Sequence, residues 1–497
     1  MDARSIIVKG LVQGVGFRPF IYRIARENHI KGWVENRNDG VIIHAEAKDT
    51  NISKFIAEIQ KKAPKASSIN HIQAKPAAIK GYHDFNIVKS SNVSDEITLV
   101  SPDIAVCDAC LEDMKKQPHR INYPFINCTN CGPRFTIIKD LPYDREKTTM
   151  APFAMCEDCK KEYENILDRR FHAQPVACQK CGPRYFMKYR NKDITGLDNI
   201  LRILTELLEK GKIIAIKGLG GFHIMCDAVN QAAVSRLREL KNREGKPFAV
   251  MFSNMVTAKE YAEIYEKEEQ LLTSWKRPIV LLKTKKPLAA DISVGFDTIG
   301  MMLPYLPLHY LIFENTHLPA VVLTSGNFSD EPIITQNEKA LSSFSGLADA
   351  VIYNDRDIHN RTDDSVSMVV SGEERILRRS RGYAPSPVIT GLLNEGIFAA
   401  GAELVNCFCI GKADQAILSQ HIGDLKNLET YDFYEETVAH YNKLFRFTPS
   451  LVVHDLHPDY LSTVYAKQTG VKALAVQHHH AHIVSCMAEH HLDEKVI

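Results

Sequence analysis

Hydrophobic residues in the first ninety positions follow two different periods, which predicts a small domain of strands and helices. Strand-like apolar runs occur at 5–10, 32–36, 41–47 and 85–88. Helical spacing occurs at 17–28 and 52–62. The second and third runs flank Asn38-Asp39-Gly40, which is typical of a hairpin turn. The predicted order is therefore βαββαβ, a ferredoxin-like α+β arrangement.

The same kind of patterning returns later in the chain and predicts two further units. Between 191 and 388 an α/β domain is indicated by strands near 213–217 and 320–323 and a helix at 229–240. The last hundred residues show apolar strands at 396–402, 407–411 and 451–455, and the pattern predicts that a new strand begins at 494. We expect domains at 1–92, 93–190, 191–388 and 389–497. The last has the pattern of half a domain, which favours a truncation or a partner that completes it.

Length and composition are typical of a modular intracellular protein. The 497 residues, 45% of them hydrophobic, are enough for several cores. No secretory signal and no apolar stretch of membrane-spanning length is present in the sequence, so we expect a cytoplasmic location and no membrane partner. Because 61 basic residues balance 60 acidic ones, no overall field attracts the chain to nucleic acid.

Eight of the twelve cysteines form four CxxC pairs, which indicates two zinc sites. The second and fourth pairs both continue as Cys-Gly-Pro-Arg and an aromatic residue, so the segment is an internal duplication. Two such pairs supply the four thiolates of one tetrahedral zinc ion. The first and second pairs are 17 residues apart and the third and fourth 18, and the sequence leaves sequential and crossed pairing open. The predicted ligands are Cys107, Cys110, Cys128, Cys131, Cys156, Cys159, Cys178 and Cys181.

A glycine-containing loop at the start of the first predicted helix favours binding of an oxyanion. In Gln13-Gly14-Val15-Gly16-Phe17-Arg18, backbone N–H groups can converge at a helix N-terminus, and Arg18 adds a forked cation. Asn36 could position an attacking water. A tight turn with a surface arginine is the alternative interpretation. GLVQGVGFRPF followed by GWVENRNDG resembles the acylphosphatase signature, which implies hydrolysis of an acyl phosphate with Arg18 on the phosphate and Asn36 on the water.

The second α/β domain carries polar groups that suit a nucleotide. Lys241 and Arg243 precede a predicted strand, and Thr324, Ser325 and Asn327 follow another, at an edge where α/β sheets bind ligands. A solvated helix end and a polar turn would explain these groups nearly as well. Arg361 and Arg379 belong to a later charged cluster that is also compatible with an ordinary ion-paired surface.

KGLGGFH, KNREGKPFAVM, LTSGN and LRRSRGYAP resemble the YrdC family. This resemblance implies ATP-dependent adenylation of a carbamate-like acid, with Lys241 and Arg243 on phosphate and Ser325 and Asn327 on the nucleotide. For His223 we favour a packed loop histidine over a catalytic role.

Two histidines near the end of the chain predict a metal site. His478 and His482 are one helical turn apart, so they could share a first-row transition metal. A solvated histidine-rich helix is the alternative, and two histidines supply at most half of a coordination shell.

The whole order of motifs, with SQHIGDLKNLET, DLHPDYLST and QHHHAHI at the end, resembles the HypF family of hydrogenase-maturation carbamoyltransferases. The resemblance implies carbamoyl phosphate and ATP with Mg²⁺ as substrates, two structural zinc ions and a HypE-type acceptor protein. It also implies an actin-like carbamoyltransferase domain at the C-terminus, of which this chain carries the first half. Relatives continue with the second half, and Val405 stands where the family commonly has lysine. We therefore expect this polypeptide alone to lack transfer to the acceptor.

Two other classes remain as alternatives. A nucleic-acid-binding zinc protein would explain the cysteine pairs, but nucleic acid is disfavoured by the balanced charge. A tRNA threonylcarbamoyl-adenylate synthase would explain the YrdC-like motifs, but it would need neither the acylphosphatase loop nor the cysteine-rich segment.

Overall fold

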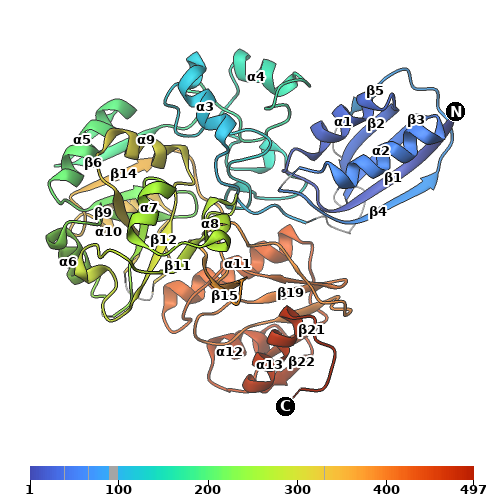
Figure 1. Cartoon of the computed structure of the whole chain (residues 1–497). Coiled ribbons are helices and arrows are strands. Elements are labelled where there is room, and N and C mark those ends of the chain that lie inside the picture. Colours follow the sequence, from blue (N-terminus) through green and yellow to red (C-terminus); the bar gives the residue numbers. More distant parts are fainter. Residues whose placement is uncertain (38–39, 65, 89–98, 244, 329–330, 497) are drawn as a thin grey trace.

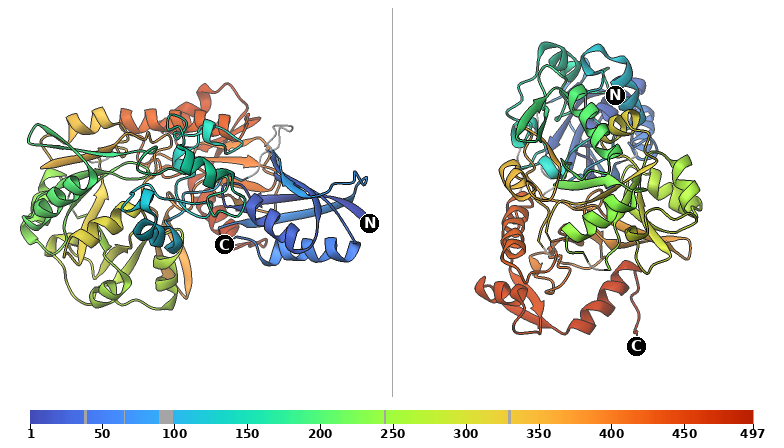
Figure 2. Two further views of the ribbon diagram at one scale, coloured as in Figure 1. Left: turned by 90° about the horizontal axis from the view of Figure 1, so that it is seen from above. Right: turned by 90° about the vertical axis from the view of Figure 1, so that its left-hand side faces the viewer.

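The computed structural model describes residues 1–37, 40–64, 66–88, 99–243, 245–328 and 331–496. Figure 1 shows the N-terminal domain at one end, the cysteine-rich segment beside it, a large α/β domain at the other end, and the C-terminal domain below. The view from above in Figure 2 shows the N-terminal domain projecting from the rest of the molecule. Among the described residues, no helix is both long and apolar enough to cross a membrane.

The N-terminal domain is a sheet in the order β4-β1-β3-β2-β5. Helix α1 packs against β2 and β5, and α2 packs against α1 and β3. Buried side chains such as Ile6, Val8, Ile43 and Phe55 fill the space between the sheet and the helices. The elements are β1 (Asp2–Leu11), α1 (Phe17–Glu27), β2 (Lys31–Arg37), β3 (Gly40–Ala47), α2 (Asp49–Lys61), β4 (Ser68–Pro76) and β5 (Phe85–Ile87).

The sequence prediction missed the strand that completes the ferredoxin-like motif. This strand, β4, pairs antiparallel with β1, whereas the run predicted as the last strand is a fifth strand, β5, that lies parallel to β2. Most side chains of β4 are exposed, so its sequence lacks an apolar alternation. The predicted turn residues Asn38 and Asp39 lie outside the described residues, as does the predicted domain boundary at residue 92.

The cysteine-rich segment is built from two similar halves. In each half the first CxxC pair opens a short helix, α3 (Asp108–Lys116) or α4 (Glu157–Glu164), and the second pair lies in a loop. Short 3₁₀ helices at Pro118–Arg120, Phe135–Ile137 and Arg145–Lys147 complete the segment. Because little regular structure is present, the segment depends on its side-chain contacts.

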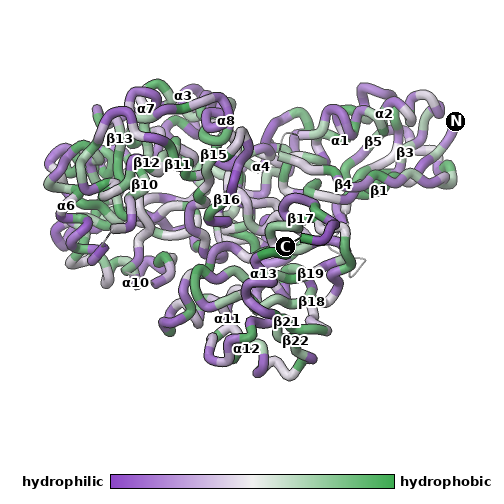
Figure 3. The backbone as a smooth tube through the Cα atoms, turned by 60° about the horizontal axis from the view of Figure 1, so that its bottom comes forward, coloured by the Kyte–Doolittle hydropathy of each residue, from purple (hydrophilic) through white to green (hydrophobic). Residues whose placement is uncertain are grey.

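The large domain is a mixed sheet in the order β16-β15-β11-β12-β10-β13-β9-β8-β14-β6-β7. Its inner strands are apolar, as the colours of β10, β12 and β13 in Figure 3 show. The strands are β6 (Tyr185–Tyr189), β7 (Lys192–Thr195), β8 (Ile214–Lys217), β9 (Phe222–Asp227), β10 (Ala249–Phe252), β11 (Ile279–Lys283), β12 (Thr298–Met302), β13 (Ala320–Ser325), β14 (Ala350–Asn354), β15 (Val366–Val370) and β16 (Glu373–Arg378). The helices are α5 (Leu197–Glu209), α6 (Gln231–Leu240), α7 (Met255–Tyr261), α8 (Glu266–Thr273), α9 (Pro307–Asn315) and α10 (Asn337–Ser343).

Two features of this sheet differ from the sequence pattern. The glycines after β8 form the turn of a hairpin with β9, a strand that was not predicted, and Gly218 N–H donates to the Gly221 carbonyl at 2.8 Å. A Cβ at Gly220 would meet Thr362 Oγ1 at 2.0 Å, so close packing explains that glycine. In addition, β6 precedes the predicted domain boundary at 190 but pairs with β14, because the sheet begins directly after the last cysteine pair.

The C-terminal domain is a second sheet in the order β17-β20-β19-β18-β21-β22. Parallel pairing of β18, β21 and β22 brings the end of β21 beside the start of the last helix. The described residues from 494 onward form no strand, contrary to the expectation of a further strand there. The elements are β17 (Val388–Ile389), β18 (Ile397–Ala399), β19 (Cys409–Lys412), β20 (Gln415–Leu418), α11 (Leu428–Leu444), β21 (Leu451–Asp455), α12 (Leu461–Gln468), β22 (Ala473–Val476) and α13 (His478–Glu489).

Candidate functional site

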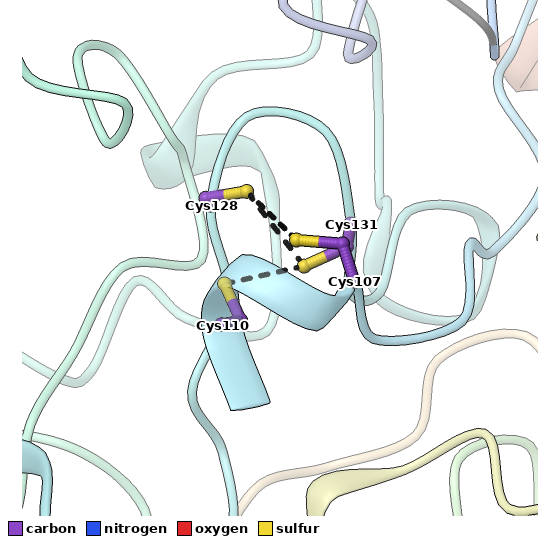
Figure 4. Close-up of side chains that lie close together, drawn as sticks. All are labelled: Cys107, Cys110, Cys128 and Cys131. Carbon is purple, nitrogen blue, oxygen red and sulfur yellow. Dashed lines mark hydrogen bonds between the residues drawn. The ribbon is translucent and has the colours of Figure 1, made fainter. Parts of the chain in front are cut away.

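The eight paired cysteines form two separate clusters, and the pairing is sequential. Cys107, Cys110, Cys128 and Cys131 converge in the first cluster (Figure 4), and the other four cysteines converge in the second. A tetrahedral zinc ion with Zn–S bonds of about 2.3 Å requires sulfur atoms roughly 3.8 Å apart. The Sγ–Sγ distances of the first cluster include 3.5, 3.7 and 3.8 Å. In the second they include 3.6 and 3.8 Å, so both donor sets fit zinc.

The first zinc-type cluster lies directly beside the predicted oxyanion loop. Arg134, from the Cys-Gly-Pro-Arg motif, donates to the backbone carbonyls of Cys128 at 3.3 Å and Thr129 at 2.9 Å. Its Nε atom also donates to the carbonyl of Gly14 in the loop. A Cβ at Gly16 would meet Asn130 Oδ1 at 2.7 Å. The loop between β1 and α1 is therefore packed against the cysteine-rich segment.

Arg18 and Asn36 come together in a pocket between these two parts of the chain. In the amide orientation that satisfies the local hydrogen bonds, the Asn36 oxygen accepts from Arg18 Nε at 3.1 Å and Nη2 at 3.3 Å. Gly14 and Gly16 have φ values of 71° and 75°, a conformation that glycine adopts without strain. The guanidinium and the glycine loop suit a small anion such as a phosphate, and this pocket is called the anion pocket below.

The cysteine-rich segment supplies the opposite wall of this pocket. Thr129 and Arg134 come from the first half, and His172 and Gln174 from the second. Arg18 is only 7% exposed, and burial lowers the pKa of its guanidinium, with the charge of Asp144 partly offsetting that effect. Burial and, to a smaller extent, the charge of Arg18 lower the pKa of His172 to about 4. His172 therefore lies neutral beside a buried cation.

A larger pocket of about 310 Å³ opens in the large domain at the ends of β9 and β13. Three of the polar residues named from the sequence line this pocket, namely Arg243, Thr324 and Ser325. Arg243 Nη1 donates to Thr324 Oγ1 at 3.3 Å. The guanidinium of Arg243 also lies 4.8 Å from the ring centre of Phe248, a cation–π contact. Lys246 and Arg378 add positive charge to the wall. The pocket is large enough for a nucleotide.

Lys241 holds the loop that carries Ser325 and Asn327. Its Nζ donates to the backbone carbonyls of Ser325 and Asn327, both at 2.8 Å, and to Asn327 Oδ1 at 3.1 Å. Ser325 Oγ donates to the same Asn327 oxygen at 2.9 Å. Burial and, to a smaller extent, the charge of Arg243 lower the pKa of Lys241 to about 7. Burial also lowers the pKa of Arg243 to about 10.

Arg361 and Arg379 lie apart from this group, where the large domain meets the C-terminal domain. The guanidinium of Arg361 is 4.6 Å from the ring centre of Phe433 in α11. Arg379 Nη2 donates to the carbonyls of Tyr383, at 3.4 Å, and Ser386. Neither arginine is among the residues that line the large pocket. The charged cluster seen in the sequence is thus divided between a pocket and a domain contact.

His223 is buried, as the packed interpretation requires, but it also lines the large pocket. Its Nε2 lies 3.2 Å from Asp364 Oδ2, and Arg381 Nε donates to the other oxygen of that carboxylate at 2.7 Å. Burial alone would raise the pKa of Asp364, but the charges of Arg381 and His223 hold it well below its usual range. Asp364 therefore fixes the orientation of the His223 ring.

A carboxylate at the end of β21 contacts the first of the two predicted metal-binding histidines of α13. His478 Nε2 and His482 Nε2 are 3.1 Å apart, which is compatible with one shared ion. His478 Nδ1 lies 2.6 Å from Asp455 Oδ2. A carboxylate behind a ligating histidine fixes the ring and its tautomer. Asp455 is thus an orienting group that the spacing of the histidines alone did not reveal.

Comparison with known protein families assigns each part of the chain. An acylphosphatase model matches residues 4–87, and a HypF finger model matches 106–138 and 155–187. A model described as telomere recombination, of the Sua5, YciO and YrdC proteins, matches 206–380. A HypF Kae1-like domain model matches 393–489. The carbamoyltransferase HypF of Rhodobacter capsulatus is 38% identical over 98% of this chain, and that of Synechocystis is 42% identical over 99%.

The chain belongs to the HypF family. A crystal structure of full-length HypF in the phosphate- and nucleotide-bound form superimposes with a TM-score of 0.96 and 48% identity over 100% of this chain. HypF from T. kodakarensis gives 0.92 and 43% over 99%. The present chain spans 64 to 66% of the length of these relatives and structures. The predicted fold class and the HypF resemblance are confirmed, and the two alternative classes are disfavoured.

Several residues that line these pockets could not be found from the sequence. Thr129, Arg134 and His172 reach the anion pocket from a segment more than a hundred residues away from the loop. Phe248 lies five residues after Arg243, but nothing in its position showed that its ring meets the guanidinium of Arg243. The duplicated Cys-Gly-Pro-Arg motif was the one available signal for Arg134.

Proposed function

We propose that this chain hydrolyses carbamoyl phosphate in the pocket at Arg18. The guanidinium and the N–H groups at the start of α1 would bind the phosphate, where positive charge and donors already converge. Arg18 holds the Asn36 oxygen, so the amide nitrogen of Asn36 is the group that would orient the attacking water. The water oxygen would bond to phosphorus, and the P–O bond to the carbamoyl group would break. The products would be phosphate and carbamate.

The large pocket would then use the carbamate. A carbamate oxygen would attack the α-phosphorus of ATP, which forms carbamoyl-AMP and releases pyrophosphate. Arg243, Lys246 and Arg378 would compensate the charge of the phosphates. ATP would enter as its magnesium complex, because Mg²⁺ is bound mainly through substrate phosphates. Lys241, Ser325 and Asn327 would shape the wall nearest the nucleotide, whereas Arg361 and Arg379 would act at the contact with the C-terminal domain.

Carbamate would pass directly from one pocket to the other. A small cavity beside the anion pocket shares Gly14, Arg134 and Tyr143 with it. Another small cavity lies between Gly132 of the cysteine-rich segment and Gly218 of the β8–β9 turn. Carbamate decomposes in water and a mixed anhydride hydrolyses, so exclusion of water protects both intermediates.

Two further elements of the proposal concern metals and the acceptor. The cysteine clusters would hold structural zinc, because four sulfur ligands leave no open position for a reaction. His478 and His482 would bind a transition metal, with Asp455 orienting His478. In full-length relatives the C-terminal domain would pass the carbamoyl group to the cysteine thiolate of a HypE-type acceptor, with AMP as the leaving group. The last step follows from the family alone.

The observation that carries this proposal is the presence of a buried arginine cradle and a basic nucleotide-sized pocket in one HypF chain. The test is the conversion of ATP to AMP and pyrophosphate by the purified chain with carbamoyl phosphate present. We expect pyrophosphate only when both substrates are supplied. Pyrophosphate that requires threonine instead, or none from a folded, zinc-loaded chain, would contradict the proposal.

The lowered pKa of Lys241 predicts that ATP binding depends on pH. With a pKa of about 7, Lys241 is mostly neutral above that pH in the free protein, but a bound triphosphate favours the protonated form. Affinity should therefore be highest below pH 7 and fall as pH rises, by up to about tenfold per unit. Calorimetry in buffers of different ionisation enthalpy would detect proton uptake on binding. Lys241→Met should abolish the uptake, and an equal uptake in that variant would assign it to another group.

A further inference from the structure

An arginine from the first half of the cysteine-rich segment contacts the second cysteine cluster. Arg120 is fully buried, and its Nη2 donates to Cys159 Sγ at 3.3 Å. The same guanidinium donates to both oxygens of Glu162, at 2.5 and 2.7 Å. Glu162 lies three residues after Cys159 in α4. Arg120 thus contacts a predicted zinc ligand of the half to which it does not belong.

The second half returns the same kind of contact. Arg169 Nη2 donates to Cys110 Sγ of the first cluster at 3.3 Å, and Arg169 Nε donates to Asp113 at 3.1 Å. Arg170 Nη2 donates to the same carboxylate at 2.5 Å. Asp113 lies three residues after Cys110 in α3, in the position that corresponds to Glu162.

Hydrogen bonds to the main chain also connect the two halves in equivalent pairs. Arg120 Nε donates to the carbonyl of Ala177, and Arg170 Nε donates to the carbonyl of Asn127, at 3.0 and 3.2 Å. Each acceptor directly precedes the third cysteine of the other half. The residues after those cysteines also match, because Thr129 N–H donates to the Arg169 carbonyl and Gln179 N–H to the His119 carbonyl, both at 3.3 Å.

The extra residue of the second half fits this symmetry. Asp113 and Glu162 lie the same number of residues after the second cysteine of their half. Arg120 and Arg170 lie the same number of residues before the third cysteine of their half. The insertion therefore lies between these two anchors. Arg120 alone makes the contacts to a cysteine and a carboxylate that Arg169 and Arg170 make together in the other half.

Charge explains why each cluster needs such a donor. Zinc with four thiolates carries a net charge of about −2, and a carboxylate lies close to each cluster. A hydrogen bond from a guanidinium to a thiolate offsets part of that charge and fixes the sulfur lone pairs. The side chain of Arg120 is 0% exposed and that of Arg169 is 31% exposed, so the two donors are partly or fully withdrawn from water.

We propose that Arg120 and Arg169 are positioning residues that act across the duplication, each stabilising the zinc site of the opposite half. The two sites then form one interlocked unit, in which zinc at one site holds in place the arginine that the other site needs. Loss of zinc from either site weakens the other. This inference rests on the zinc occupancy proposed above.

The test measures the reactivity of each cysteine in the full chain. Zinc content is determined first, and two ions per chain are expected. The protein is then treated with a chelator and N-ethylmaleimide, and mass spectrometry follows alkylation of each cysteine peptide. Arg169→Met should speed initial alkylation of the first cluster by about tenfold or more, with the second cluster following later. Arg120→Met should show the mirror image, with the second cluster reacting first.

Internal and external controls separate this effect from general loosening. Arg169 is the safer position, because Arg170 keeps the ion pair with Asp113 in its absence. Arg169→Lys should give an intermediate rate, since it keeps the charge but loses the fork. Arg202→Met in α5 removes an exposed arginine that pairs with Glu206, and it should change neither cluster.

The order of reaction decides the outcome. The proposal is wrong if Arg169→Met speeds alkylation of the second cluster first, of both clusters equally, or of neither cluster. If the unsubstituted chain binds no zinc, the zinc assignment fails before the arginines are tested, which keeps the two failures distinct.

Discussion

Arg18→Ala is expected to lower carbamoyl-phosphate hydrolysis by about 10²–10³-fold, the usual effect of removing one preorganised donor to a developing charge. The loss has two physical sources. The guanidinium is the buried cation of the pocket, and its two hydrogen bonds hold the Asn36 oxygen. Its removal would take away both the proposed phosphate contact and the orientation of the proposed attacking water. Phosphate release from carbamoyl phosphate, followed over time, is the measurement.

The same variant also tests the order of the two reactions. If carbamate made at Arg18 feeds the large pocket, Arg18→Ala should lose carbamoyl-phosphate-dependent pyrophosphate formation, and added carbamate should restore it. Arg23→Ala is the matched control, because Arg23 lies on the exposed face of the same helix. Hydrolysis that survives in Arg18→Ala would refute the assignment of this pocket. Lost pyrophosphate that carbamate does not restore would refute the order of the two steps.

Local sequence patterns were sufficient where neighbouring residues determine the structure. The spacing of the CxxC pairs placed all eight sulfur atoms in two clusters, because two cysteines in one turn necessarily face the same ion. The glycines before Phe17 correctly indicated the loop at the start of α1. Periodicity also found the strands and helices with one buried face, such as β1 and α1.

The sequence was insufficient where the determining contact is distant. Strand β4 has no apolar alternation, so only its pairing with β1 shows it to be a strand. Arg134 looked like part of a zinc motif, yet its side chain reaches Gly14 in another domain. Lys241 was interpreted as a phosphate contact, whereas in the free protein it holds the carbonyls of the Ser325 loop. In each case the partner lies far along the chain, where no local pattern records it.

The contact between the zinc segment and the anion pocket leads to a second large effect. Cys131→Ser should remove one zinc ion and also impair carbamoyl-phosphate hydrolysis, although the cysteine does not line the pocket. Structural zinc contributes about 10–16 kcal/mol to the folding of a small site, so loss of one thiolate should release the ion. The Cys128–Cys131 loop then loses its fixed form. Arg134 and Thr129, which this loop positions, are walls of the pocket.

We expect zinc content to fall from two ions to one or fewer and hydrolysis to fall by about tenfold or more, within the range typical of residues that orient a site from behind. Cys486→Ser is the control, since Cys486 is exposed on α13 and belongs to neither cluster. Metal analysis and phosphate release on the same samples connect the two effects. If Cys131→Ser loses zinc but hydrolyses carbamoyl phosphate at the original rate, the acylphosphatase-like domain works without its zinc-held wall, and the pocket at Arg18 is complete within residues 1–88.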